Sequence, residues 1–325
     1  MTPNIVFFLS AFLLSLPVWL GFNTSSSALS EAFFWKEMTE NPAILQAQLI
    51  QTRLQEQVLQ ERPTLKPDTL SPDIQAGSAF SLFLDKEGNT KVLFEKEGEL
   101  RLPIASLTKL MTALVTVKHY DPTQQIVITS RAVAEEENLG QLRAGDVFPA
   151  QDLLYPLLME SSNDAAAALA QVVGRGVFVE LMNLEARELG LFNTYFLNPT
   201  GLDPDDPQGP VNYSTSKDLA LLVSYIVRTY PGIFDILAIP QQDLLHKGAF
   251  HHTMKNTNEL LSFEGWPTPI VGGKTGWTPL AKGALVLVLQ SPKDQGYLVN
   301  VVLGAEDRFL QMKTLVSWVY DSFLW

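Results

Sequence analysis

Strand-like segments lie at both ends of the region from about residue 75 to the C-terminus, and a long helical stretch separates them. Near its start, residues 79–84 and 91–95 read as a β-hairpin, and residues 285–289 and 298–303 near its end read as two more strands. Strands from both ends combine most simply in one antiparallel sheet, with helices on its faces and a helical insertion. The sequence therefore predicts a mixed α/β (α+β) fold.

The remaining periodic segments of this region carry apolar residues at helical spacing. The stretch at 152–173 is interrupted at 161–164, just before an alanine-rich run at 165–170. The predicted helices lie at 104–120, within 152–173, at 177–189, at 216–228 and at 309–325.

The N-terminus carries an apolar segment of its own. Residues 5–22 contain no charged side chain, and Ser26-Ser27-Ala28 offers small residues where a signal peptidase cuts. This length fits a short membrane-spanning helix and is long for a cleaved signal peptide. We predict that residues 1–30 are a membrane anchor or a signal peptide, and that the rest of the chain is exported in either case.

Residues 31–73 are predicted to connect this segment to the main domain. An apolar stripe at helical spacing between Asn41 and Arg62 predicts a helical stalk, which either self-associates or serves as a spacer. Pro63, Pro67 and Pro72 then indicate an extended linker. We place the domain boundary near residue 73, so that residues 74–325 form the catalytic domain.

Charge and cysteine content exclude several function classes. The formal net charge is −12 with no basic run to offset it, which disfavours nucleic acid as a partner. The chain has no cysteine, so a thiol nucleophile, a disulfide scaffold and a Cys-ligated metal are excluded. With only four histidines, chemistry must rest mainly on Ser, Lys, Asp, Glu or backbone groups.

Ser106-Leu107-Thr108-Lys109 lies at the start of the predicted 104–120 helix. A spacing of three residues places the hydroxyl and the amine side by side on one face. Serine needs a base to act as a nucleophile, and a lysine that burial keeps neutral can be that base. The motif is weak alone, because Ser214 to Lys217 repeats it at the start of an ordinary helix.

Ser161-Ser162-Asn163 falls at the break in the stretch at 152–173. A hydroxyl and a carboxamide two residues apart can face one cleft, where they relay a proton and hold a lysine or a substrate amide. The alternative is that Ser161 or Ser162 only caps the following helix.

Lys274-Thr275-Gly276 lies in a strand with small residues on both sides, and Trp277 follows it. Small residues in a strand allow the backbone of a ligand to approach closely. An ammonium and a hydroxyl at such a place suit a substrate carboxylate, whereas an isolated triplet fits a surface strand equally well.

The three motifs in this order are the signature of penicillin-binding proteins and class A β-lactamases. From about residue 75 to 325 the chain resembles the serine D-alanyl-D-alanine carboxypeptidases of peptidase family S11, with a β-lactamase/transpeptidase-like fold. Further similar stretches are residues 103–114, 161–166, 198–202, 218–220, 256–261 and 273–276.

The resemblance implies a role for each motif residue. Ser106 would attack the carbonyl of the penultimate D-alanine, Lys109 would take its proton, and Ser161 would pass a proton to the leaving D-alanine. For the substrate, the resemblance implies binding by Asn163, Lys274, Thr275, Gly276 and Trp277, with backbone N–H groups of Ser106 and Trp277 as the oxyanion hole.

The resemblance also implies the partners of the protein. These are peptidoglycan stem peptides as substrates and β-lactam antibiotics as acylating inhibitors, with no metal or organic cofactor. The expected location is the extracytoplasmic face of the bacterial cell membrane, held there by residues 5–22, or secretion after signal cleavage.

Three features depart from the family pattern. Trp277 stands where many relatives have histidine, and Lys282 interrupts an Ala-Gly step that is common in the family. The chain also ends directly after the catalytic region, so the N-terminal apolar segment would be the only membrane attachment.

Four alternatives remain. A DD-endopeptidase would use the same residues, and a class A β-lactamase would need a deacylating glutamate, for which Glu188 is a poor candidate because it falls in a predicted helix. A zinc peptidase is disfavoured because His246, His251 and His252 form no H-E-x-x-H motif. A catalytically inactive wall-binding protein is disfavoured because the motif residues are intact.

Overall fold

The computed structural model describes residues 46, 50–51, 63–134, 141–206 and 208–325. Contacts divide the chain into two units, residues 1–62 and 63–325, and the fold described below is that of the second. The predicted anchor at 5–22 and nearly all of the predicted stalk lie outside the described residues. The domain boundary near residue 73 stays a prediction.

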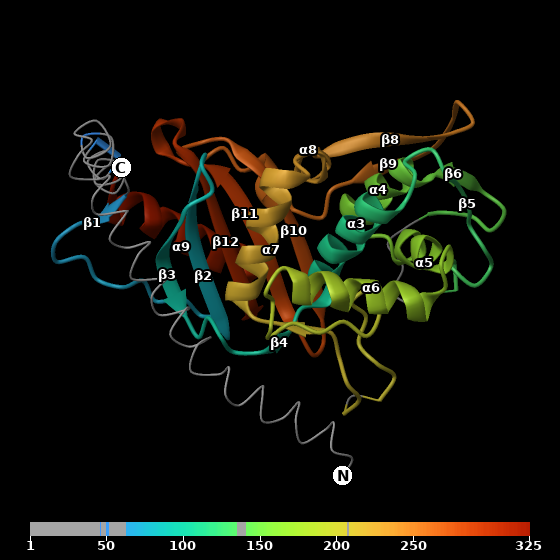
Figure 1. Ribbon diagram of the computed structural model, residues 1–325, viewed down its shortest axis with the longest axis horizontal. Helices are drawn as coiled ribbons and strands as arrows, with labels where there is room; N and C mark the ends of the chain where they lie inside the picture. The colour runs from blue at the N-terminus through green and yellow to red at the C-terminus, as the bar shows by residue number, and fades with distance from the viewer. Residues whose placement is uncertain (1–45, 47–49, 52–62, 135–140, 207) are drawn as a thin grey trace, which may run out of the picture. The chain divides into compact units, whose positions relative to one another are not determined.

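A five-stranded antiparallel sheet forms the centre of the second unit (Figure 1). Its strand order is β10-β11-β12-β2-β3, so strands from the two ends of the unit lie side by side through the pairing of β12 with β2. The mixed α/β prediction with one antiparallel sheet built from both ends is confirmed. The strands are β2 (Ser78–Asp85), β3 (Thr90–Lys96), β10 (Ile270–Thr278), β11 (Lys282–Gln290) and β12 (Gly296–Ala305).

The strands β2, β11 and β12 are buried on both faces of the sheet, with successive side chains of each strand pointing to opposite sides. In β11, Val286 and Val288 belong to one hydrophobic cluster, and Leu285 and Leu287 belong to a second cluster on the other face. The second cluster includes α9 (Arg308–Ser322), while the first includes the remaining helices. The near-continuous apolar sequence of β11 follows from this double burial.

The helices of the first cluster form the insertion that the sequence predicts. Figure 1 shows α7 against the sheet and α3 to α6 gathered beyond its β10 edge. These helices are α3 (Thr108–His119), α4 (Ala150–Leu158), α5 (Asn163–Gln171), α6 (Arg175–Glu188), α7 (Ser216–Thr229) and α8 (Gly232–Leu237).

Short strand pairs and 3-10 turns complete the unit. The strand pairs are β1 (Thr64–Leu65) with β13 (Phe323–Leu324), β4 (Leu102–Pro103) with β7 (Tyr213–Ser214), β5 (Gln125–Val127) with β6 (Val147–Pro149), and β8 (Gln241–His246) with β9 (Ala249–Lys255). The turns are η1 (Ala105–Leu107), η2 (Glu259–Ser262) and η3 (Pro292–Asp294).

Two local differences from the sequence prediction have physical reasons. The helix predicted at 104–120 begins as the 3-10 turn η1, because Ala105 has a φ of +46° that an α-helix cannot contain. The predicted linker does not run free in its first residues, because the Lys66 backbone N–H donates to the carbonyl oxygen of Ser322 at 2.8 Å.

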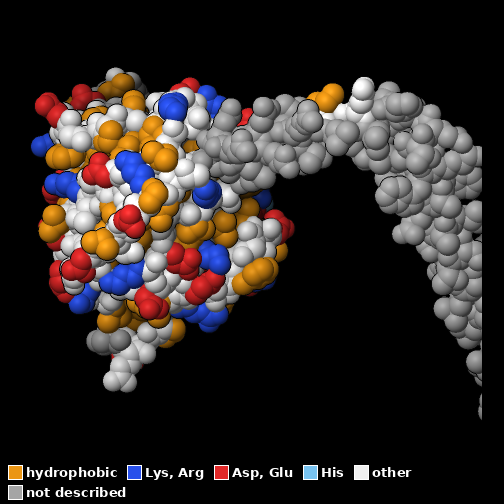
Figure 2. All heavy atoms as spheres, turned by 90° about the vertical axis from the view of Figure 1, so that its left-hand side faces the viewer, with side chains coloured by type: hydrophobic (Ala, Val, Ile, Leu, Met, Phe, Trp, Pro, Cys, Tyr) orange, Lys and Arg blue, Asp and Glu red, His pale blue; other side chains and the backbone are white. Residues whose placement is uncertain are grey.

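Figure 2 shows the side of the unit that carries β3 and α9, where acidic, basic and hydrophobic side chains are interspersed over the described residues.

In the part of the chain that the structure describes, no single helix has the length and apolar character needed to span a membrane. Helices α5 and α6 meet the length and composition limits only as a pair bent by 98°.

Candidate active site

Ser106 and Lys109 lie at the junction between η1 and α3. The amine Nζ of Lys109 is 2.9 Å from Oγ of Ser106, so the spacing of three residues brings the two groups together. Lys109 is fully buried, although its side chain is among the longest in the protein. Beyond Ser106, the same Nζ lies 2.8 Å from Oδ1 of Asn163 and 2.7 Å from the main-chain oxygen of Thr200.

The second motif lies in the loop between α4 and α5. Ser162 is the N-cap of α5, because its hydroxyl accepts a hydrogen bond from the backbone N–H of Ala165 at 3.2 Å. Ser161 and Asn163, on either side of this cap, both line the pocket described below. Ser161 has a φ of +63°, a left-handed conformation that costs a non-glycine residue about 1–2 kcal/mol.

The third motif lies in β10 at the edge of the sheet. Lys274 Nζ donates to Oγ of Ser161 at 2.9 Å and to the main-chain oxygen of Thr275 at 3.0 Å. Burial, and secondarily the positive charge of Arg308, lower the pKa of the Lys274 ammonium to about 7. The hydroxyl of Thr275 is 2.6 Å from that of Thr257.

Gly276 is required for the close approach of β10 to the first motif. A Cβ at this position would lie 3.0 Å from the backbone nitrogen of Ser106 and 3.1 Å from the main-chain oxygen of Ile104. The small residue therefore lets the edge strand pack directly against the turn that carries Ser106.

The three motifs open into one groove of about 230 Å³. Six predicted site residues line it directly, whereas Lys109 and Lys274 lie beneath and reach it through their hydrogen bonds to Ser106 and Ser161. Trp277 stands at its rim with 57% of its surface exposed. The lining comprises Ser106, Ser161, Asn163, Gly201, Leu202, Thr257, Thr275, Gly276, Trp277, Thr278 and Arg308.

The loop at residues 198–202 supplies the oxygen that holds Lys109. Oδ1 of Asn198 accepts hydrogen bonds from the backbone N–H groups of Thr200 and Gly201 at 3.2 and 2.7 Å. Gly201 has a φ of +85°, and a Cβ there would lie 2.0 Å from the oxygen of Ala105. The sequence marks this segment as family-like without assigning it the contact to the lysine.

Arg308 is a groove residue that the sequence analysis did not assign to the site. It follows Asp307, the N-cap of α9, and lies in no motif. It faces the groove only because α9 packs behind β11 and β12. Its positive charge adds to that of the lysine on β10.

The residues weighed for competing functions lie elsewhere. The side chain of Glu188 on α6 is 57% exposed and 4.0 Å from Lys118. Lys217 of the second S-x-x-K is at the start of α7, where Thr215 is the N-cap, and it pairs with Glu99 on the surface. His251 and His252 are each paired with a carboxylate.

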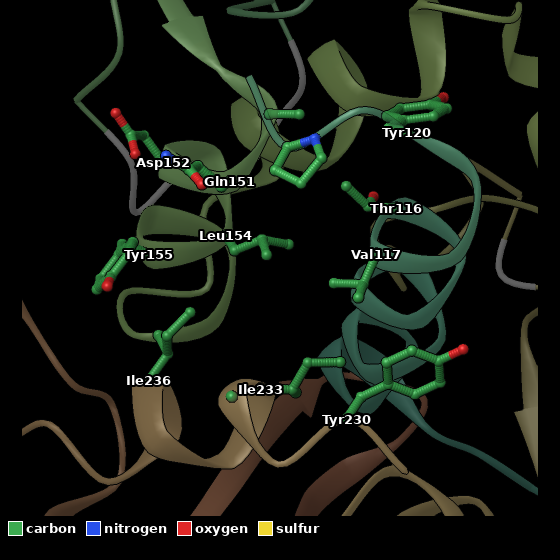
Figure 3. Close-up of a pocket in the computed structure, with 13 residues that line it drawn as sticks. Thr116, Val117, Tyr120, Gln151, Asp152, Leu154, Tyr155, Tyr230, Ile233 and Ile236 are labelled. Atoms are coloured by element: carbon green, nitrogen blue, oxygen red, sulfur yellow. The ribbon is translucent and has the colours of Figure 1, made fainter. Parts of the chain in front are cut away.

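A second cavity, of about 530 Å³, lies between α3, α4 and α8 and contains none of the motif residues. Figure 3 shows Leu154, Val117 and Ile233 pointing toward one another across it, with Asp152 and Tyr155 at its margin. Burial raises the pKa of the Asp152 carboxyl. This cavity is larger than the groove and is lined mainly by apolar side chains.

Known proteins resemble this chain in sequence and in fold. The family model described as D-alanyl-D-alanine carboxypeptidase, Peptidase_S11, matches residues 66–307. A D-alanyl-D-alanine endopeptidase of Pseudomonas aeruginosa is 33% identical over 66% of this chain and 67% of its own length. The D-alanyl-D-alanine carboxypeptidase DacF of Bacillus subtilis is 28% identical over 76% of this chain and 64% of its own length, so the match leaves about a third of each relative uncovered.

Solved structures show the same fold. A D-alanyl-D-alanine carboxypeptidase of Mycobacterium tuberculosis matches with a TM-score of 0.69 and 27% identity, over 79% of this chain and 96% of that one. A penicillin-binding protein of Listeria monocytogenes in its ampicillin-bound form matches with a TM-score of 0.64 and 25% identity, over 78% of this chain and 100% of that one.

Proposed function

The chain belongs to the S11 family of serine D-alanyl-D-alanine carboxypeptidases, and we propose that it removes the terminal D-alanine from peptidoglycan stem peptides through an acyl-enzyme on Ser106. The observation that carries this proposal is the contact of Lys109 Nζ with Ser106 Oγ at 2.9 Å, at the floor of a groove that the other two motifs complete. Membership of this family identifies the protein as a serine-type hydrolase of the bacterial cell wall.

The three contacts of Lys109 Nζ can be met by a neutral amine. An uncharged amine has two N–H donors and one lone pair. Its two N–H groups match the oxygens of Asn163 and Thr200, at 2.8 and 2.7 Å, and its lone pair then faces the hydroxyl of Ser106. A general base needs this arrangement, because the lone pair must meet the proton that it takes.

Acylation then follows from the geometry. Oγ of Ser106 attacks the carbonyl carbon of the penultimate D-alanine while its proton moves to Nζ of Lys109. The carbonyl oxygen becomes an oxyanion, which the backbone N–H groups of Ser106 and Trp277 hold. Each such donor is worth about 3 kcal/mol in the transition state.

Release of D-alanine uses the second motif. When the C–N bond breaks, the leaving nitrogen needs a proton. We assign its delivery to the hydroxyl of Ser161, which lies 2.9 Å from Lys274 Nζ, and the proton that Lys109 took from Ser106 then replaces the one that Ser161 gave. Water then attacks the acyl-enzyme. Its proton passes by way of Ser161 to Lys109, which returns it to Oγ of Ser106 as the acyl bond breaks. Hydrolysis frees Ser106 for the next cycle.

Substrate binding falls to the third motif. A stem peptide ends in a carboxylate, and Lys274, Thr275 and the groove-lining Arg308 offer the positive charge and hydroxyl that would hold it. Asn163 has an amide group that can bond a substrate amide. Gly276 and Trp277 provide the backbone along which the peptide lies.

β-Lactams are proposed as acylating inhibitors on the same grounds. They combine a reactive carbonyl with a carboxylate, and the Listeria monocytogenes relative was solved in ampicillin-bound and cefotaxime-bound forms.

We also propose that the catalytic region works on the extracytoplasmic side of the membrane, held by residues 5–22 or secreted. Membrane fractionation of cells expressing the protein distinguishes these two outcomes.

The test uses purified full-length protein and a stem pentapeptide ending in two D-alanines. Free D-alanine should appear, fluorescent penicillin should label the protein covalently, and both should disappear in Ser106→Ala. A folded wild-type protein that releases no D-alanine and takes no label would disprove the proposal and support the wall-binding alternative.

A DD-endopeptidase is the second candidate, because two relatives at 33% and 30% identity carry that name. The same assay with a cross-linked peptide dimer separates the two activities. Faster cleavage of the dimer than of the pentapeptide would assign the endopeptidase function, and the reverse would assign the carboxypeptidase function.

A further inference from the structure

Glu160 directly precedes Ser161 and is 6% exposed. Its two carboxyl oxygens each lie 3.1 Å from Nε2 of His252, on β9. The residue before the proposed proton donor is thus tied by its side chain to the β8–β9 hairpin. None of the three motifs includes this contact.

The contact continues as a line of side chains. Nδ1 of His252 lies 2.7 Å from Nδ1 of His251, and Nε2 of His251 lies 2.9 Å from Oδ2 of Asp146. We call these four residues, Asp146, His251, His252 and Glu160, the carboxylate–histidine network. Among the described residues, no group of three or more His, Asp or Glu side chains has the arrangement of a metal site.

Counting protons shows what the carboxylate–histidine network must hold. Each of its three contacts joins two atoms that accept hydrogen bonds unless one of them carries a proton, so three shared protons are needed. Two neutral imidazoles and two ionised carboxylates bring only two. The network is complete only when it carries one additional proton.

The surroundings indicate where that proton lies. Burial, with the nearby Asp164 carboxylate, raises the pKa of Glu160 to about 7. The pKa of His252 is lowered chiefly by burial, and further by the charge of Arg143 and by that of His251 whenever His251 is protonated. The Asp146 carboxyl has a lowered pKa despite its partial burial, because His251, the Arg143 backbone N–H and His246 favour its ionised form.

One pattern satisfies all three contacts with both histidines neutral. The Glu160 carboxylic acid donates to Nε2 of His252, Nδ1–H of His252 donates to Nδ1 of His251, and Nε2–H of His251 donates to the Asp146 carboxylate. Loss of the additional proton leaves two facing acceptors at one contact and a buried Glu160 carboxylate close to that of Asp164.

The consequence falls on Ser161, whose φ of +63° persists only if its neighbours hold it. On the backbone, the Thr257 N–H donates to the oxygen of Met159 at 3.0 Å, and the Ser162 N–H donates to that of Pro156 at 2.9 Å. Between these two contacts, the Glu160 side chain is held by His252 and the Ser161 hydroxyl by Lys274. Release of the Glu160 side chain lets the hydroxyl of Ser161 move away from Lys274.

We propose that Glu160 is a positioning residue for Ser161 that works as a carboxylic acid, and that the carboxylate–histidine network makes the second motif depend on one proton. The effect on the reaction rests on the proposed function, whereas the protonation pattern does not. Its expected signature is a fall in acylation rate as pH rises through about 7, because the network then loses its proton.

The first experiment reads the protonation pattern directly in the full-length wild-type protein. ¹H–¹⁵N correlation NMR of ¹⁵N-histidine-labelled protein at pH 6 should show neutral His252 protonated at Nδ1 and neutral His251 protonated at Nε2. Both histidines protonated only at Nε2, or His252 protonated at both nitrogens, would overturn the assignment of the proton to Glu160.

The second experiment compares Glu160→Gln with Glu160→Ala in the penicillin acylation rate from pH 5 to pH 9. Glutamine keeps a neutral donor to His252, so Glu160→Gln should retain the wild-type rate at pH 6. Above pH 7 its rate should fall less than that of wild type, because only the loss of the Lys274 charge then remains. Glu160→Ala should be slower by about 10- to 100-fold at all pH values, because a displacement of about 1 Å near the chemistry costs this much. Coincident profiles of wild type and Glu160→Gln would overturn the proposal.

Glu185→Gln is the matched control. Glu185 is also buried, with its carboxyl 3.1 Å from His119 and 2.6 Å from Lys118, but it lies on α6 away from the groove. Its substitution should lower the melting temperature and leave the pH profile unchanged, and a changed profile would contradict a local role for Glu160. If wild type is not acylated at all, the proposed function fails, while the histidine spectra still decide the network.

Discussion

The cavity between α3, α4 and α8 is larger than the motif groove, but the groove has the more polar surroundings. The cavity, at about 530 Å³, exceeds the groove, at about 230 Å³. The groove rests on two buried lysines whose amines contact side chains of the first and second motifs, whereas Leu154, Val117 and Ile233 face one another in the cavity. Converging polar groups held by burial, and not volume, therefore distinguish the groove that we propose as the reactive site.

The two regions are linked through shared elements. Helix α3 borders the cavity and begins directly after Leu107 of the first motif, and α4 ends just before the second. Helix α8 packs against β10, which carries the third. The comparison thus predicts that changes in the groove alter chemistry, and that changes in the cavity alter stability.

The largest expected effect is that of Lys109→Ala. Without the amine that contacts Ser106, no base takes the proton of the nucleophile, so the penicillin acylation rate should fall by about a thousandfold or more. Lys217→Ala is the control, because it removes the lysine of the second S-x-x-K, which is outside the groove. Equal rates for Lys109→Ala and wild type would show that the groove is not where the chemistry takes place.

Lys274→Met should reduce kcat/KM for the pentapeptide by about a hundredfold, because a charged donor to the substrate is lost. In wild type the ammonium has a pKa of about 7, so KM should rise as the pH increases above this value. Lys282→Met on the neighbouring strand, where Lys282 pairs with Glu306 at the surface, should leave both values unchanged. A KM independent of pH would exclude the ammonium as carboxylate ligand.

Lys274→Met should also change how the stability of the protein depends on pH. The pKa of Lys274 is lower in the folded protein than in the unfolded chain, so the native state binds fewer protons. The free energy of unfolding of wild type should therefore rise between pH 7 and pH 10, relative to that of Lys274→Met. Urea denaturation at pH 6, 8 and 10 measures the difference, and a constant difference would contradict the burial of the charge.

Ile233→Ala is expected to have the smallest effect on chemistry. Ile233 is 2% exposed and lines the cavity, so its truncation should lower the free energy of unfolding by about 2–5 kcal/mol. The acylation rate of the folded fraction should remain within about twofold of wild type. A rate loss as large as that of Lys274→Met would show that the two regions do not act separately.

Short sequence motifs predicted much of the geometry of the candidate site. The S-x-x-K spacing predicted that Ser106 and Lys109 would meet, and the structure brings them to 2.9 Å. The S-x-N motif was open to a capping interpretation, and the structure divides the roles, with Ser162 as the cap and Ser161 facing the groove. The 3-10 turn at Ala105 was not predicted, because a positive φ there leaves no periodic signal.

The amino-acid sequence alone determined the antiparallel sheet, the helical insertion and the three motifs, since strand alternation, helical spacing and short motifs are encoded by residues close together in the chain. Only the tertiary structure decided which distant groups meet. Thr200 accepts from Lys109, Arg308 enters the groove from α9, and Glu160 meets His252 across 92 residues. Such contacts arise when packed elements bring unrelated positions together, and no local pattern records them.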